Sequence, residues 1–314
     1  MELIAAHVIF RHGERTPVAT FPTDPMREKD WPVGYGQLTT TGMEQQHRLG
    51  KYLRDRYGSI LNTTYIANEI YVRSTDYDRA LMSAESNLVG LYPLDNISDD
   101  KIPIQPVPIH TVPQDQEFLL SMNTCPRYDQ IQTQMSQTDQ FKNLSIYYNI
   151  QIWTNLSHVN MLNTVYVADT VFIERIYNKT PTWVDEAVLK NLSDIRDLFF
   201  YLSYSDNDSK RIRGGPLIQD IWINMNDASQ GRTYRKFASA IFLDLLKQNS
   251  TYYVKVEYLN VTDSNQPYSY LLEGCPALEC PLNTFTTIYQ PRFPANATVE
   301  CTIKVPSNSS SKLI

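Results

Sequence analysis

The sequence feature that most constrains the fold is an apolar run that leads directly into a cluster of charged residues. Residues 3–10 read LIAAHVIF and residues 11–17 read RHGERTP. The run has strand length and lacks the basic flank and small-residue cleavage site of a signal peptide. Because open α/β sheets bind ligands at the carboxyl ends of their strands, this order predicts an α/β fold with a site directly after the first strand.

Strands and helices alternate in the first part of the chain. A second apolar run of strand length lies at 69–74, and a helical pattern follows each run. The first helix is expected to begin at a capping box formed by Thr41 and Glu44. The second is expected to run from Asp78 to a stop at Pro93. This alternation predicts a sheet with helices on its faces.

The pattern changes between residues 124 and 204, where helices are separated by polar loops. We interpret 124–204 as a helical cap inserted into an α/β core domain, which is formed by 1–123 and 205–314.

In the second part of the core, a helix is expected to follow Gly214-Gly215-Pro216. The segments FASAIFLDLL and YYVKVEYLNV then predict two antiparallel strands. Roughly the last thirty residues, which are interrupted by Pro and Cys, are expected to be coil.

The charge and hydropathy of the chain limit its partners. The 314 residues carry a formal net charge of -6 and give a pI near 5.4. These values argue against nucleic acid, because its backbone requires a basic face. The sequence contains no run of 18 apolar residues that would span a bilayer. Small molecules or proteins therefore remain open as partners, whereas nucleic acid and a membrane are not expected. We also expect no metal and no cofactor.

Eleven Asn-x-Ser/Thr triplets without Pro at the middle position are spread over the chain. This density is typical of a protein that traverses the secretory pathway, where such asparagines are glycosylated. We therefore expect an extracellular or lumenal location. The candidate acceptors are Asn62, Asn96, Asn143, Asn155, Asn178, Asn191, Asn207, Asn249, Asn260, Asn296 and Asn308.

The four cysteines favour two disulfides in an oxidising compartment, because their number is even and two of them flank a short loop. A zinc site is the alternative. It is disfavoured because the spacing lacks paired ligands and no histidine follows His158. The cysteines are Cys125, Cys275, Cys280 and Cys301.

The charged segment after the first strand contains groups suited to phosphate. Arg11 and Arg15 supply guanidinium forks for phosphate or carboxylate oxygens, and His12 between them can attack phosphorus. The segment RSTDYDR at 73–79 follows the second strand and can bring Arg79 to the same end of the sheet. Exposed surface charge is the alternative interpretation, but the placement of both segments after strands favours one anion site.

These segments resemble the histidine acid phosphatases of the prostatic and lysosomal type. The resemblance extends from VIFRHGERTPVATFPTDP through WPVGYGQLTTTGMEQ, YVRSTDYDRALMSA, PVPIHTVP and GGPLIQDI to YYVKVEYLN and LEGCPALECPL, and it is weakest in the helical cap. It implies the fold of that family, a histidine-phosphatase-like sheet with flanking helices. It also implies that His12 matches the phosphorylated nucleophile and that Arg11, Arg15 and Arg79 match the residues that hold the phosphate.

A His-Asp pair that protonates the leaving alcohol in that family has no match in this chain. The histidines are His7, His12, His47, His110 and His158, and none lies beyond the helical cap, where the pair is expected. We interpret this as the loss of one strand and its following helix before residue 237. The family's usual six cysteines are reduced to four, and the resemblance implies the pairs Cys125–Cys301 and Cys275–Cys280.

The chain also resembles the catalytically degenerate acid-phosphatase-like proteins of flea saliva. That resemblance implies a secreted protein that is not an enzyme. It would bind and sequester biogenic amines, such as serotonin and catecholamines, and leukotrienes, and so oppose haemostasis and inflammation during blood feeding. A leukotriene carboxylate would contact Arg11, Arg15 or Arg79. The partners of an amine are not assigned, and the aromatic residues considered are Tyr147, Tyr148, Trp153 and Tyr166.

Two other functions remain open. The first is acid phosphatase activity through a phosphohistidine at His12, with Asp244 or another carboxylate in place of the lost proton donor. The second is a glycoprotein scaffold whose arginines bind nothing in particular. Hydrolysis of an activated aryl phosphate and calorimetric titration with the proposed ligands discriminate among the three.

Overall fold

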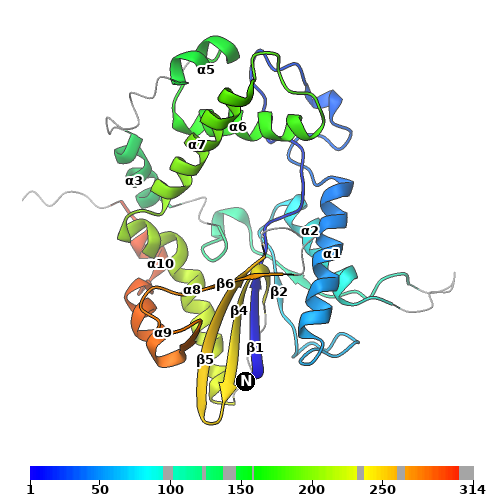
Figure 1. Ribbon diagram of the computed structural model, residues 1–314, viewed down its shortest axis with the longest axis vertical. Coiled ribbons are helices and arrows are strands. Elements are labelled where there is room, and N and C mark those ends of the chain that lie inside the picture. Colours follow the sequence, from blue (N-terminus) through cyan, green and yellow to red (C-terminus); the bar gives the residue numbers. More distant parts are fainter. Residues whose placement is uncertain are drawn as a thin grey trace, which may run out of the picture.

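The computed structural model describes residues 1–94, 102–121, 125–136, 146–157, 159–231, 237–259 and 266–303. A central sheet has helices on both sides, and a separate group of helices lies beyond one end of the sheet (Figure 1). The predicted α/β class is therefore confirmed. No helix in these ranges is both long and apolar enough to cross a membrane.

In the described ranges the main sheet has five strands, with the order β1-β4-β5-β6 and β7 also paired to β5. All of these pairings are antiparallel. The expected hairpin is confirmed as β4 and β5, in which Gln248 pairs with Thr251. The strands are β1 (Glu2–Ile9), β4 (Phe237–Gln248), β5 (Thr251–Tyr258), β6 (Tyr268–Tyr270) and β7 (Glu279–Pro281).

A second, parallel pair of strands is separate from the main sheet. It consists of β2 (Val72–Arg73) and β3 (Ile109–His110). The sequence predicted a longer strand over 69–74, which is wrong. The segment before Val72 is turn and coil instead, and Glu69 in it accepts a hydrogen bond from the Asn62 amide at 2.8 Å.

Only seven residues, 230–236, separate the end of helix α8 (Asn207–Ser229) from β4, which begins at Phe237. A parallel strand with its crossover needs a dozen or more residues, so this interval has no room for a strand followed by a helix. The pairing of β1 with β4 shifts register after Leu3 and again around His7 and Ile9. The irregular pairing lies next to the place where the sequence predicts a missing unit.

The two faces of the sheet pack against different helices, because successive side chains of a strand point to opposite faces. Ala6 and Val8 of β1 belong to a cluster with helices α1 (Thr40–Tyr57) and α2 (Asp78–Leu91). Ala5 belongs to a second cluster with α8 and helix α9 (Leu282–Tyr289). Figure 1 shows these helix pairs on opposite sides of the strands. The carboxyl end of β1 is directed toward the separate helical group.

Helix α1 begins two residues earlier than the predicted capping box allows. Its N-cap is Thr39, whose side chain accepts a hydrogen bond from the Gly42 amide at 3.1 Å. The Thr41–Glu44 capping box is therefore wrong. A threonine two residues upstream takes this role, and its amide and hydroxyl both bond to the Glu14 carbonyl oxygen in the loop after β1.

The helical cap has a hydrophobic cluster of its own. Its members come from α5 (Ile146–Thr154), α6 (Met161–Ile176) and α7 (Glu186–Ser203), together with Phe21 from the segment after β1. In Figure 1 this early segment, in blue, rises from β1 to lie beside α6. Helix α3 (Pro126–Ser136) instead packs against α8. The core and the cap therefore meet along the segment that follows the RHGERTP motif.

Helix α8 runs through Gly214-Gly215-Pro216, where the sequence predicts that a helix only begins afterwards. Asp206 caps the helix by accepting from the Ser209 amide at 2.9 Å, eight residues before Gly214. A Cβ atom at Gly215 would lie 2.3 Å from the Arg292 carbonyl oxygen. The glycine therefore permits a close approach between two segments and does not end the helix.

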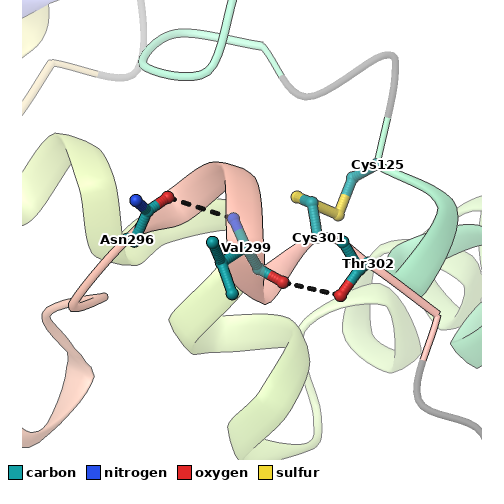
Figure 2. The surroundings of a disulfide bond; sticks show 5 residues. All are labelled: Cys125, Asn296, Val299, Cys301 and Thr302. Atoms are coloured by element: carbon teal, nitrogen blue, oxygen red, sulfur yellow. Dashed lines mark hydrogen bonds between the residues drawn. A yellow bond between two sulfur atoms is a disulfide. The ribbon is translucent and has the colours of Figure 1, made fainter.

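The C-terminal region contains helices where the sequence predicts coil. Besides α9, it forms α10 (Ala297–Glu300), whose N-cap Asn296 accepts from the Val299 amide at 3.0 Å (Figure 2). The next residue, Cys301, is joined to Cys125. The second disulfide is Cys275–Cys280, so both pairs agree with those implied by the resemblance. The short 3-10 helices of the chain are η1 (Glu28–Asp30), η2 (Gln114–Gln116) and η3 (Gln290–Arg292).

Candidate anion-binding site

The loop after β1 is held against the first turns of α1. A Cβ atom at Gly13 would lie 2.2 Å from the Gly42 carbonyl oxygen, so glycine is required at this step of the motif. The Gln46 side chain donates to the Arg11 carbonyl oxygen at 3.0 Å. The Glu14 amide donates to Gln45 Oε1 at 2.9 Å. The backbone on both sides of His12 is thereby anchored to one helix.

Helix α2 holds the same loop from the other side and contributes Arg79. The Gly13 amide donates to Ser83 Oγ at 3.1 Å, and Ser83 Oγ donates to the Arg79 carbonyl oxygen at 2.6 Å. The Arg79 guanidinium lies over the Tyr77 ring, 4.5 Å from its centroid. Sequence analysis named Arg79 but not Ser83, because a lone serine in a helix carries no signal of a distant contact.

Four residues selected from the sequence are brought together here, and we call them the arginine pocket: Arg11, His12, Arg15 and Arg79. The pKa of His12 is lowered to about 4, first by burial and then by the charges of the three arginines, against an opposing contribution from its bond to Gly13. His12 is therefore neutral at pH 7. Its Nδ1 lies 2.8 Å from the Gly13 carbonyl oxygen. Donation from Nδ1 to that oxygen leaves the Nε2 lone pair free.

The pocket holds positive charge that is incompletely neutralised. Burial, and then the charge of Arg15, lower the pKa of both Arg11 and Arg79. Arg11 shows this shift although its side chain still reaches solvent. A guanidinium with a lowered pKa is a charge that its surroundings disfavour. An anion bound between Arg11 and Arg79 would relieve this repulsion, which is the property expected of a phosphate or carboxylate site.

The cap supplies a carboxylate that the sequence did not identify. Asp169 of α6 accepts two hydrogen bonds from Arg15, with N–O distances of 2.9 and 3.0 Å. Its charge also raises the pKa of Arg11 and Arg79, in opposition to their neighbours. Arg15 and Asp169 are 154 residues apart in the chain. No local motif relates two such positions, so only the folded structure reveals the contact.

Further contacts of α6 extend this junction between cap and core. Thr170 Oγ1 donates to the Ala19 carbonyl oxygen at 2.9 Å. The Tyr177 hydroxyl, just after α6, donates to Glu14 Oε1 at 2.6 Å. The contacts of Asp169, Thr170 and Tyr177 together hold the cap directly above the motif.

A buried pair of carboxyl groups also lies in this junction. Glu174 of α6 is 0% exposed and Asp24 is 3% exposed. The pKa of Glu174 is raised to about 9, first by burial and then by Asp24. The protonated Glu174 is therefore the form present at pH 7, and it can donate to Asp24. This pair is a structural contact, because no solvent reaches Glu174.

Asp244 does not lie in the arginine pocket. It pairs with Ala6 in the sheet and binds Arg56 at 2.7 Å and the Tyr57 hydroxyl at 2.8 Å. Arg56 belongs to the last turn of α1, whereas the motif contacts the first turn of that helix. The idea that Asp244 replaces the proton donor of the family is therefore wrong, because its carboxylate is committed to a distant ion pair.

Of the aromatic candidates in the cap, the structure describes the side chains of Trp153 and Tyr166. Trp153 stacks on Trp183, with centroids 5.2 Å apart, inside the hydrophobic cluster of the cap. Tyr166 is 46% exposed. The side chains of Tyr147 and Tyr148 lie outside the described residues. Aromatic groups that contact Arg79 or the motif include Tyr77, which lies under the Arg79 guanidinium, and Tyr177, which bonds to Glu14 and packs edge-to-face with Trp31.

The described residues contain no group of three or more His, Cys, Asp or Glu side chains that would hold a metal ion. All the sequon asparagines that fall in these ranges are exposed: Asn62, Asn155, Asn178, Asn191, Asn207, Asn249 and Asn296. The other four, Asn96, Asn143, Asn260 and Asn308, lie outside them, as does His158.

Comparison with known proteins identifies the class to which this fold and pocket belong. Residues 2–235 match the Histidine phosphatase superfamily (branch 2), and the chain belongs to this family. Mouse prostatic acid phosphatase is 35% identical over 343 residues, which cover 96% of this chain and 89% of the mouse protein. Lysosomal acid phosphatase of Xenopus laevis is 35% identical over 341 residues, covering 96% and 79% respectively.

Solved structures show the same fold at lower identity. The Hafnia alvei phytase in complex with tartrate has a TM-score of 0.68 and 16% identity, covering 96% of this chain and 99% of the phytase. The phytase of Klebsiella sp ASR1 has a TM-score of 0.67 and 14% identity, covering 97% and 98%. At this identity the likeness concerns the fold alone.

Proposed function

We propose that this member of the histidine phosphatase superfamily is a secreted binding protein that has kept the anion pocket and is not an efficient phosphatase. The observation that carries the proposal is the arginine pocket itself. Arg11, Arg15 and Arg79 converge on His12 and hold positive charge that an anion would neutralise. Such a pocket binds small anionic ligands whether or not it turns them over.

The lack of a histidine beyond residue 158 supports binding over turnover. The chain has no histidine after His158, and it passes from α8 to β4 with no room for a further strand and helix. The alignment with the mouse enzyme spans 343 residues, more than the 314 of this chain, so the relative contains residues that this chain lacks. Loss of a general acid typically lowers the rate by about 10²–10⁴-fold.

The ligands that we propose are leukotrienes and biogenic amines such as serotonin and catecholamines, sequestered in host blood by a salivary protein. A leukotriene carboxylate suits Arg11 and Arg79, because both guanidinium groups lack a carboxylate partner of their own among the described residues. The exposed sequons support passage through the secretory pathway, which secretion in saliva requires.

Acid phosphatase activity through His12 is the second candidate, and the geometry of His12 favours it. A neutral imidazole with Nδ1 bonded to the Gly13 carbonyl presents Nε2 as a nucleophile. The curated relatives are named as prostatic and lysosomal acid phosphatases. An activated ester with a good leaving group would need no proton donor in the first step.

Two measurements on the purified protein separate these functions. The first is hydrolysis of glycerol 2-phosphate, whose poor alkoxide leaving group requires the proton donor, between pH 4 and 7, with prostatic acid phosphatase as the reference. The second is calorimetric titration with serotonin, a catecholamine, a cysteinyl leukotriene and a nucleotide. We expect hydrolysis at least a hundredfold below the reference, together with saturable heat for a mediator. Turnover near the reference would overturn the binding proposal, and no heat with any ligand would favour a scaffold.

A further inference from the structure

The carboxylate of Asp169 retains acceptor capacity after it has bound Arg15. A carboxylate offers about four lone-pair sites, and the two bonds from Arg15 use one on each oxygen. The side chain of Asp169 is 25% exposed, whereas that of Arg15 is 10% exposed. Arg15 thus fixes the position of the carboxylate, and the remaining lone pairs can accept from a ligand ammonium.

An ammonium at Asp169 would nevertheless meet repulsion from the rest of the pocket. With His12 neutral, the three guanidinium groups and the one carboxylate leave two positive charges in excess. Arg11 and Arg79 both act on Asp169 electrostatically. Like charges at this range oppose one another strongly where water is partly excluded. A free amine therefore finds an acceptor in the pocket but an unfavourable field around it.

We propose that Asp169 makes the pocket a two-ended site in which a cation binds well only when an anion occupies Arg11 and Arg79. The inference rests on the proposed binding function and specifies its ligand chemistry. The ligand class that fits is a zwitterion, whose carboxylate or phosphate contacts the guanidinium groups of Arg11 and Arg79 while its ammonium contacts Asp169. A simple amine satisfies the same site together with a separate small anion.

Wild-type protein tests this coupling without any substitution. Serotonin is titrated calorimetrically in a low-chloride buffer, first alone and then with saturating inorganic phosphate. We expect phosphate to raise serotonin affinity about tenfold, and serotonin to raise phosphate affinity by the same factor, because a binding coupling is reciprocal. Equal serotonin affinity with and without phosphate would overturn the proposal, as would competition between the two.

The variant Asp169→Asn tests the residue that we hold responsible. It keeps the shape of the side chain but removes the charge, so we expect opposite effects on the two ligands. Serotonin affinity in phosphate should fall about tenfold, and phosphate affinity should rise several-fold because a neighbouring negative charge is lost. A merely structural role for Asp169 would lower both affinities, and that result would contradict the proposal.

Glu174→Gln is the matched control. It changes a carboxyl group on the same helix and in the same junction, but one that is buried away from the pocket and protonated at pH 7. We expect both affinities to stay unchanged in this variant.

If serotonin binds equally with and without phosphate, the coupling fails while the binding function stands. If no mediator binds under any condition, both fail.

Discussion

Two charge clusters at opposite ends of α1 show how the same residue types serve different purposes. The arginine pocket adjoins the first turn of the helix, and Arg56 lies in its last turn. Arg56 binds the carboxylates of Asp244 and Glu257. Burial disfavours the charge of Arg56, but its partners outweigh this and raise the pKa of Arg56. The pKa values of Arg11 and Arg79 are instead lowered.

The opposite directions of these pKa shifts distinguish a structural cluster from a binding cluster. Positive charge at Arg56 is balanced inside the protein, so the cluster holds α1 against β4 and β5. Positive charge at Arg11 and Arg79 is not balanced, so the pocket favours an external anion. The comparison predicts that substitutions in the first cluster act on stability and those in the second act on binding.

The largest effect is expected for Arg56→Met. It leaves Asp244 without a cation and Glu257 with Lys255 alone, and both carboxylates are almost fully buried. Breaking a buried ion pair in this way typically costs about 3–5 kcal/mol in the free energy of unfolding. Urea unfolding at pH 7 measures the loss. Lys51→Met, on the exposed side of the same helix, is the control and should change stability by no more than about 0.5 kcal/mol. If Arg56→Met lost less stability than Lys51→Met, the contrast between the two charge clusters would be wrong.

Arg79→Gln is expected to act on binding instead. Removing one charged donor should lower the affinity for inorganic phosphate by roughly tenfold to a hundredfold, since a hydrogen bond to a charged group contributes about 1.5–3 kcal/mol. The free energy of unfolding should stay the same or increase, because burial and the neighbouring arginines disfavour the charge of Arg79. Calorimetry and urea unfolding provide the two readings, with the exposed Arg48→Gln as control. Unchanged phosphate affinity together with a loss of stability would show that Arg79 is structural.

The pH dependence of stability gives the next effect. The folded pKa of His12 is about 4, below its ordinary value of 6.5. Between these pH values the unfolded state therefore binds more protons than the folded state. Stability is therefore full above pH 6.5 and falls as the pH decreases toward 4. His7, buried in β1, acts in the same direction. His12→Gln should reduce this acid-side loss by on the order of 1 kcal/mol, after allowance for partial solvent screening.

Urea unfolding of wild type and His12→Gln at pH 7, 5.5 and 4.5 measures this difference. Parallel curves for the two proteins would mean that His12 titrates normally in the folded state.

The smallest effect is expected for Glu174→Gln. The folded pKa of Glu174, about 9, exceeds its ordinary value of 4.5, so stability falls as the pH rises between these values. A neutral amide removes this decline. The variant should match wild type at pH 4 and already be more stable at pH 5.5 by about 1 kcal/mol, since each pH unit between the two pKa values contributes about 1.4 kcal/mol. Loss of stability at both pH values would show that the amide cannot replace the protonated carboxyl beside Asp24.

The sequence predicted only those residues of the pocket that belong to local motifs. Arg11, His12 and Arg15 follow an apolar run, and Arg79 opens the helix after the next strand. Their proximity was therefore predictable, although the two strands belong to separate sheets. Asp169 was not, because it lies in a different helical unit. The capping box at Thr41 was wrong for a related reason: Thr39 serves both as N-cap and as a contact to the motif loop.

By itself, the sequence determined the α/β class, the motif, the disulfide pairs implied by resemblance and the absence of a histidine beyond residue 158. These depend on local periodicity and on residue type. Only the tertiary structure decided that Asp169 binds Arg15, that Asp244 binds Arg56 and that α8 continues through a proline. The physical reason is that charge balance and close packing depend on distances between segments far apart in the chain.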